Sequence, residues 1–129
     1  MISALLLLAA CSSSSNSPPT AAAQKAAVRV TYSATSGSSS SQQATITYTD
    51  PLDGSHNSIP GKPGWLYTYT KVPVTKPIAL QVRVTGPDPS RYSCAIRING
   101  HKVTSQNGQS GAAPGTAVTC NYSLTPSNA

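Results

Sequence analysis

Two segments decide the fold of this chain, YSCAIRING at residues 92–100 and VTCNYSL at residues 118–124. In both segments apolar and polar residues alternate, which is typical of a β-strand with one buried face. The dipeptide Asn99-Gly100 ends the first segment and predicts a type I′ hairpin turn, because both residues accept a positive φ. We therefore expect antiparallel strands whose apolar faces meet in one core.

Cys94 and Cys120 fall on the apolar faces of these segments, so both side chains are expected to enter that core. A disulfide between them would close a loop of roughly 26 residues and contribute about 3.5 kcal/mol in the chain-entropy treatment. Two buried free thiols are the alternative. The disulfide is favoured by the N-terminal segment, which predicts a compartment where thiols oxidise.

That N-terminal segment is apolar over residues 2–10, apart from Ser3. As a helix it would span only about 13 Å, whereas the hydrocarbon core of a bilayer is about 30 Å thick. We interpret residues 1–10 as a lipoprotein signal segment. LAAC at residues 8–11 resembles a bacterial lipobox, in which Cys11 is lipidated and becomes the new N-terminus. No Lys or Arg precedes the apolar run, so an upstream start, a weak signal and a chance cysteine stay open.

Lipidation of Cys11 would hold the protein on the extracytoplasmic face of the cell membrane through several acyl chains. It also accounts for the three cysteines, because one would carry lipid and two would pair outside the cytosol. The Ser-, Pro- and Ala-rich residues that follow, within 11–26, predict a disordered linker. Residues 27–125 would form the folded domain and residues 126–129 a tail.

Alternating residues predict further strands near residues 28–32, 44–48, 65–69 and 78–84. The stretch between Asp50 and Gly64 reads as irregular, and residues 108–115 as a flexible loop. About seven short antiparallel strands with one disulfide predict an immunoglobulin-like β-sandwich, with an open barrel as the nearest alternative.

The composition limits the functions open to this domain. Only 38% of the 129 residues are hydrophobic, Phe is absent and Trp occurs once, so the core is modest. Nine Lys and Arg against three Asp give a net charge of +6. The basic residues are scattered singly, which argues against nucleic acid as a partner. Attraction to an anionic membrane or an acidic envelope polymer, or solubility alone, would explain the charge.

Residues suited to catalysis are few. The carboxylates of Asp50, Asp53 and Asp88 lie in or beside turn dipeptides, and Glu is absent. His56 and His101 are isolated in the sequence. No paired acid and base, nucleophile elbow or metal-ligand spacing is present. We predict a protein that is not an enzyme and that has no metal or cofactor.

The aromatic residues Trp65, Tyr67 and Tyr69 alternate along one predicted strand. They are candidates for a binding face, although aromatics in this pattern more often fill a core.

The order of several segments resembles a known family. These segments are VTY at 30–32, ITYTD at 46–50, Trp65 after a Pro-Gly-rich bend, CAIRING at 94–100, and Cys120 in the last strand. Over roughly residues 28–124 the pattern resembles the extracytoplasmic domain of the MmpS family, small membrane proteins of mycobacteria and their relatives. The resemblance implies a β-sandwich accessory protein that works beside MmpL-type transporters of the RND superfamily, which export lipids or siderophores.

Members of that family typically carry a full membrane-spanning helix, whereas this chain carries the shorter lipobox segment. Two other functions therefore stay open at this point. One is a free-standing envelope lipoprotein that binds a lipid, a glycan or a siderophore. The other is a surface-exposed interaction protein with no role in transport.

Overall fold

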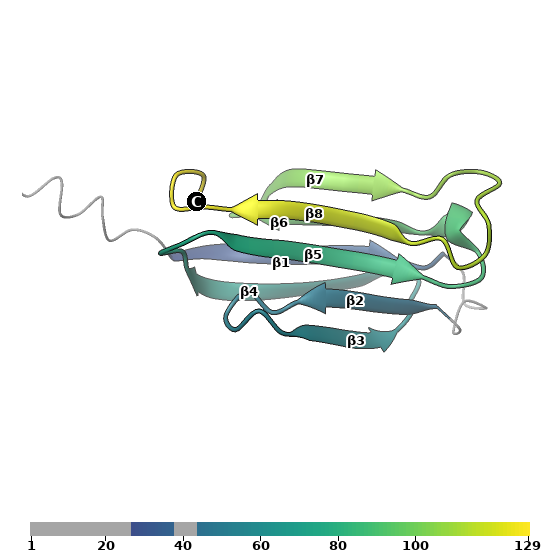
Figure 1. Cartoon of the computed structure of the whole chain (residues 1–129), viewed down its shortest axis with the longest axis horizontal. Coiled ribbons are helices and arrows are strands. Elements are labelled where there is room, and N and C mark those ends of the chain that lie inside the picture. The colour runs from purple at the N-terminus through teal and green to yellow at the C-terminus, as the bar shows by residue number, and fades with distance from the viewer. Residues whose placement is uncertain (1–26, 38–43) are drawn as a thin grey trace, which may run out of the picture.

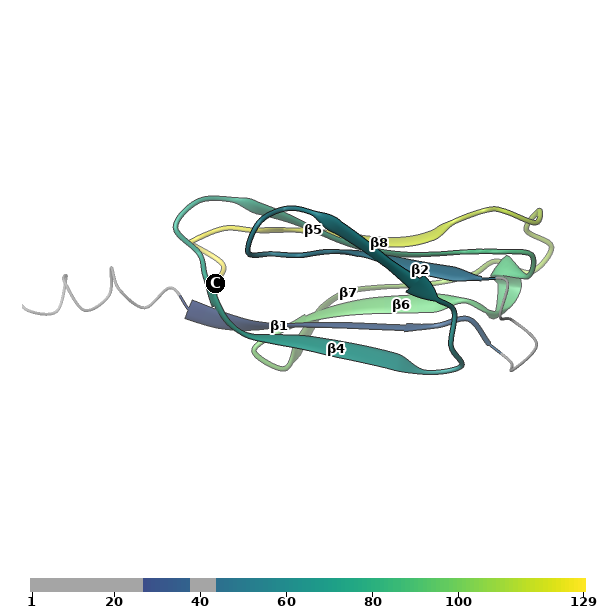
Figure 2. The ribbon, with the colours of Figure 1, turned by 90° about the horizontal axis from the view of Figure 1, so that it is seen from below.

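The computed structural model describes residues 27–37 and 44–129 and contains two antiparallel β-sheets packed face to face (Figures 1 and 2). Sheet A has the strand order β4-β1-β6-β7, and sheet B has the order β3-β2-β5-β8. The predicted β-sandwich is confirmed, with eight strands in the described residues. Their bounds are β1 (Ala27–Thr35), β2 (Thr45–Thr49), β3 (His56–Pro60), β4 (Trp65–Pro73), β5 (Ile78–Thr85), β6 (Ser93–Ile98), β7 (His101–Asn107) and β8 (Val118–Leu124), with a 3₁₀ turn η2 (Pro89–Arg91) before β6.

The core lies between the sheets and is built from the alternating residues that the sequence indicates. In β5 the buried residues Leu80, Val82 and Val84 alternate with residues that are exposed or partly exposed. In β1 and β6, too, every second residue is buried, beginning with Val28 and Cys94. Successive side chains of a strand point to opposite faces, so one face of β1, β5 and β6 packs inward against the other sheet. The side chains with almost no exposure include Val30, Tyr32, Ile46, Leu80, Val82, Ile96 and Leu124.

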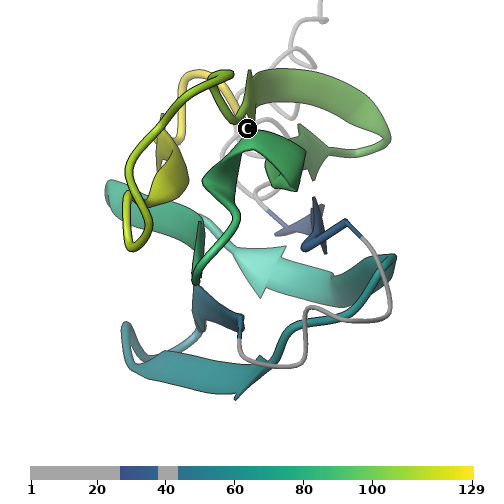
Figure 3. The same cartoon turned by 90° about the vertical axis from the view of Figure 1, so that its right-hand side faces the viewer.

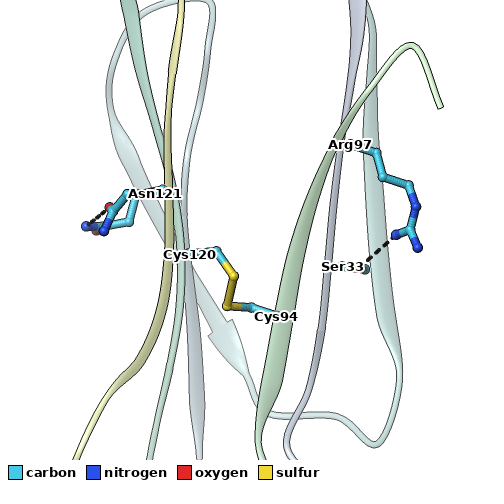
Figure 4. The surroundings of a disulfide bond; sticks show 6 residues. Ser33, Cys94, Arg97, Cys120 and Asn121 are labelled. Carbon is cyan, nitrogen blue, oxygen red and sulfur yellow. Dashed lines mark hydrogen bonds between the residues drawn. A yellow bond between two sulfur atoms is a disulfide. The ribbon is translucent and has the colours of Figure 1, made fainter. Parts of the chain in front are cut away.

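A disulfide joins the two sheets through this core. Cys94 in β6 and Cys120 in β8 are bonded, with their Cα atoms 6.1 Å apart (Figure 4). Cys120 has no exposed surface and Cys94 is 3% exposed. The predicted pairing is therefore confirmed, and it connects the sheets at the side where β7 lies over β8.

The opposite side of the sandwich is more open. There the edge strands are β4 in sheet A and β3 in sheet B, and close backbone contacts of β4 are made chiefly with its own neighbour β1. The view along the strands in Figure 3 shows the two layers from the end that carries η2. Side chains from β4 and β2 fill the space at this side, as described below.

Strand β3 corrects the expectation of an irregular segment between Asp50 and Gly64. It pairs with β2 from Thr45↔Pro60 to Thr49↔His56. Four of its five residues are exposed, and only Ile59 is partly buried. An edge strand with so little burial has no alternation of apolar residues, so the sequence pattern did not indicate it.

The β6–β7 turn has the predicted conformation. Asn99 has φ 52° and Gly100 has φ 86°, the two positive values that a type I′ turn requires. The side-chain oxygen of Asn99 also accepts a hydrogen bond from the backbone N–H of Arg29 at 2.9 Å. The turn is thereby fastened to the start of β1.

The predicted signal segment of residues 1–10, Cys11 and the predicted linker within residues 11–26 lie outside the described residues. Within residues 27–37 and 44–129, no helix has the length and apolar character required to cross a bilayer.

The disulfide gives a direct prediction for stability. In a Cys11→Ser background, replacing Cys94 and Cys120 together by Ala should lower the free energy of unfolding by about 3.5 kcal/mol, because the unfolded chain is no longer closed into a loop of sequence separation 26. Urea unfolding followed by circular dichroism measures this change. Equal stability of the oxidised parent and the double variant would contradict a stabilising bond.

Candidate functional site

Five aromatic side chains gather at the open side of the sandwich, and we call them the aromatic row. Adjacent rings are in contact: the ring centroids of Tyr48 and Trp65 are 4.9 Å apart, as are those of Tyr67 and Tyr69. Trp65 and Tyr67 are nearly parallel, with an interplanar angle of 14° and a centroid distance of 6.3 Å. The row consists of Tyr32, Tyr48, Trp65, Tyr67 and Tyr69.

Pairing with β1 places the three β4 rings on the inner face of sheet A. Trp65 is opposite Ala34, Tyr67 is opposite Tyr32, and Tyr69 is opposite Val30. These β1 partners are buried, so the same face of β4 points toward sheet B. Because β4 is an edge strand, its rings lie at the rim of the core and not at its centre.

Exposure increases along the row from the core to the solvent. Tyr32 is completely buried, Tyr48, Trp65 and Tyr69 are partly buried, and Tyr67 is 44% exposed. The structure thus brings together the three residues that the sequence singled out. It adds Tyr32 and Tyr48. The sequence placed both on the apolar faces of their predicted strands, but their position beside β4 depends on the strand order, which the sequence pattern did not indicate.

Burial raises the pKa of three tyrosines of the row, Tyr32, Tyr48 and Tyr69. The Tyr32 hydroxyl donates a 2.6 Å hydrogen bond to the carbonyl oxygen of Thr49, and burial, with Tyr69 and Asp50 nearby, raises its pKa far above the ordinary value. Burial, followed by the charge of Asp50, raises the pKa of Tyr69 to about 12. Burial and the neighbouring Tyr67 also raise the pKa of Tyr48. The hydroxyl groups of these three tyrosines therefore stay protonated to a higher pH than that of a free tyrosine.

Such a surface is suited to non-covalent recognition. Large, rigid rings bury much apolar area with little loss of conformational freedom, and their hydroxyl groups satisfy a polar partner. The rings pack on one another, so what they offer to a partner is a strip along β4 centred on Tyr67. Leu66, the next residue along β4, is 65% exposed and lies on the other face of the sheet.

An open depression of about 520 Å³ lies on the outer face of sheet A. Trp65 and Leu66 contribute to one side of it and Lys102 to the other. Small and hydroxyl-bearing residues make up most of the remaining lining: Ser33, Ala34, Thr35, Ser93, Ala95 and Ser105.

The carboxylates are engaged in local structure. Asp50 and Asp53 each accept a 2.8 Å hydrogen bond from a backbone N–H two residues ahead, as turn residues do. Asp88 forms an exposed ion pair of 3.0 Å with Arg91. His56 lies in β3 and His101 in β7, in different sheets. In the described part of the chain no three His, Cys, Asp or Glu side chains come together in a group able to hold a metal ion.

Comparisons of the chain with protein-family models, with curated proteins and with solved structures each found no match. The resemblance to the MmpS family therefore stays a prediction from the residues quoted above.

The buried phenols predict a loss of stability at high pH. An unfolded chain releases tyrosine protons near pH 10, at about the ordinary pKa, whereas folded Tyr69 holds its proton up to about pH 12. Stability is fully present below about pH 10 and is lost as the pH rises through the folded-state pKa. Urea unfolding at a series of pH values, read alongside tyrosinate absorbance, measures this. A free energy of unfolding that stays constant up to about pH 12 would contradict the burial of these phenols.

Proposed function

We propose that this protein is a lipid-anchored, extracytoplasmic accessory protein that assists an MmpL-type exporter of lipids or siderophores, and that it does so through non-covalent contacts of the aromatic row. The observation that carries the proposal is the exposure of Tyr67 within a continuous row of rings on an edge strand. Aromatic residues are enriched in the central parts of protein interfaces, where they contribute much of the binding energy.

The edge strand itself supports a contact with another protein. Among residues 27–37 and 44–129, no strand lies beside β4 on the side that faces away from β1. A partner segment could add there as a further strand, with its side chains against the rings. Lys71 and Pro73 near the end of β4 would discourage pairing of this edge with a second copy of the chain. The surface open to a partner is therefore the first part of the strand, which carries Trp65 and Tyr67.

The membrane anchor would supply proximity to an exporter. If Cys11 is lipidated, the 15 residues between it and β1 limit the domain to at most about 55 Å from the bilayer surface, from the covalent reach of the chain. Confinement of the domain to the membrane raises its effective concentration beside a transporter, so a modest contact area suffices. The MmpS-like pattern of residues 28–124 is the reason for choosing an MmpL-type transporter as the partner.

Lipidation can be tested by substitution. Cys11→Ser should move the protein from the membrane fraction to the soluble fraction of its native cells, because acyl chains can no longer be attached. Ser13→Ala is the matched control and should leave the protein in the membrane fraction. Retention of the Cys11→Ser protein in membranes would contradict a lipid anchor.

Partner binding can be tested at two adjacent positions of β4. Tyr67→Ala should reduce the recovery of an RND-type transporter with the protein from detergent-solubilised membranes by tenfold or more, at about 2 kcal/mol for a central aromatic contact. Leu66→Ala is the control, because Leu66 is also exposed but lies on the opposite face of the sheet. Recovery of no transporter with the unaltered protein, or equal losses from both variants, would contradict the proposal.

The second candidate is direct binding of a lipid, a glycan or a siderophore by the same row. The nearly parallel rings of Trp65 and Tyr67 favour it, since flat aromatic surfaces pack against the apolar faces of such ligands. Trp65 is the only Trp in the chain, so its fluorescence reports on ligands at this site without ambiguity. A ligand-dependent change that Tyr67→Ala removes, with no transporter recovered, would favour this function over the first.

A further inference from the structure

Four basic residues form a band across the outer face of sheet A, one on each strand. We call them the basic band: Lys71 of β4, Arg29 of β1, Arg97 of β6 and Lys102 of β7. The four residues are far apart in the sequence, so the sequence pattern does not indicate that they are neighbours. Arg29, Lys71 and Lys102 are exposed, and Arg97 is partly buried.

The pairing register brings these residues together. Arg97 is directly opposite Lys102 on β7 and opposite Thr31 on β1, which makes it a diagonal neighbour of Arg29. Between the pairs Val28↔Val72 and Val30↔Tyr69 the register shifts, so that Lys71 and Thr70 together face Arg29. Two residues that oppose one in such a bulge both lie beside it. The band therefore runs through four neighbouring strands.

The band faces away from the core. Arg97 alternates with the buried residues Ile96 and Ile98, and its guanidinium lies 3.4 Å from the hydroxyl of Ser33 on the side of the sheet opposite the disulfide (Figure 4). Arg97 and Lys102 carry like charges directly opposite each other, an arrangement that destabilises a sheet. Within residues 27–37 and 44–129, the one ion pair is that between Arg91 and Asp88, far from this band along the strands. The charges of the band are thus available to an external anion.

The hydroxyl-lined depression adjoins the band. Lys102 borders it, and Ser33, which contacts Arg97, lines it together with Ser93 and Ser105. Lys and Arg beside hydroxyl donors are the groups that bind phosphate. Exposed Leu66 lies at the other side of the depression and supplies apolar surface.

We propose that the outer face of sheet A docks on anionic phospholipid headgroups, with the basic band supplying the charge and the depression beside Lys102 receiving a headgroup phosphate. The position of the band in the fold supports a membrane over an acidic polymer. β1 begins at Ala27, two residues before Arg29, so the first described residue of the domain lies beside the band. A lipid on Cys11 would therefore be joined to the domain at the end of β1 that carries Arg29 of the band.

Docking in this orientation would place edge strand β4, with its aromatic row, alongside the bilayer. An exporter in the same membrane would then meet the row directly. The inference rests on the envelope location in the proposed function, but it does not depend on an exporter.

The test uses the purified full chain with Cys11→Ser, so that no acyl chain contributes, and vesicles of phosphatidylcholine with or without phosphatidylglycerol. We expect partitioning onto the vesicles that contain phosphatidylglycerol, weakening as ionic strength rises. Arg97→Gln with Lys102→Gln should lower the partition coefficient roughly 25-fold, at the usual contribution of a basic residue near an anionic surface. Arg29→Gln with Lys71→Gln should act similarly.

The matched control is Lys62→Gln with Arg83→Gln, which removes the same charge from the β3–β4 connection and from sheet B. This pair should change the partition coefficient by less than about threefold. Thermal unfolding of every variant checks that the fold is retained. Equal losses from the control pair and the band pairs would overturn the proposal, as would equal binding to pure phosphatidylcholine. Displacement from vesicles by alginate at a far lower concentration of charge than that of the lipid would assign the band to an acidic polymer instead.

An exporter recovered with the protein but no vesicle binding would overturn this inference while leaving the proposed function standing. Vesicle binding with no exporter recovered would support this inference and contradict the proposed role beside an exporter.

Discussion

The covalent bond between Cys94 and Cys120 is the constraint on which the rest of the structure depends. It crosses the core between β6 and β8 and holds the sheets together at the side where β7 and β8 meet. The domain needs such a bond because its core contains no Phe, consists mainly of aliphatic side chains, and is small. Fixing one side of the sandwich leaves the other side to be closed by side chains alone.

The aromatic row performs that closure. Tyr32 anchors the row from β1 through its hydrogen bond to Thr49 in β2, so this one contact bridges the sheets. Tyr48 and the rings of β4 then continue outward until Tyr67 reaches solvent. The same residues that complete the core would thus form the proposed recognition surface. A partner that binds at Tyr67 would contact a surface that packing already holds rigid, which keeps the entropic cost of binding low.

Much of the fold could be predicted from local alternation, and the failures have a physical cause. Val28 to Tyr32, Ile78 to Val84 and the Cys94 hairpin have one buried face each, so their period-2 patterns are strong. β3 buries almost nothing, and no pattern in its five residues marks it as a strand. Trp65, Tyr67 and Tyr69 were recognisable as a group because one strand carries all three.

The basic band could not be predicted from the alternation of apolar and polar residues. Arg29, Lys71, Arg97 and Lys102 are spread over the whole domain sequence, and only the strand order β4-β1-β6-β7 and its register make them neighbours. Strand order depends on long-range contacts that the local alternation of apolar and polar residues does not reveal. The two proposed surfaces therefore lie on opposite faces of the same sheet, one indicated by the sequence and the other by the strand order.

The disulfide joins the two sheets at one side of the sandwich, and only side chains close the other side. Hydrogen–deuterium exchange of the oxidised protein tests this arrangement most directly, because sheet B has one edge strand at each side. The amides that β8 donates to β5 should exchange as slowly as those of central strands, whereas the amides that β3 donates to β2 should exchange much faster. Equal protection of β3 and β8 would contradict this account.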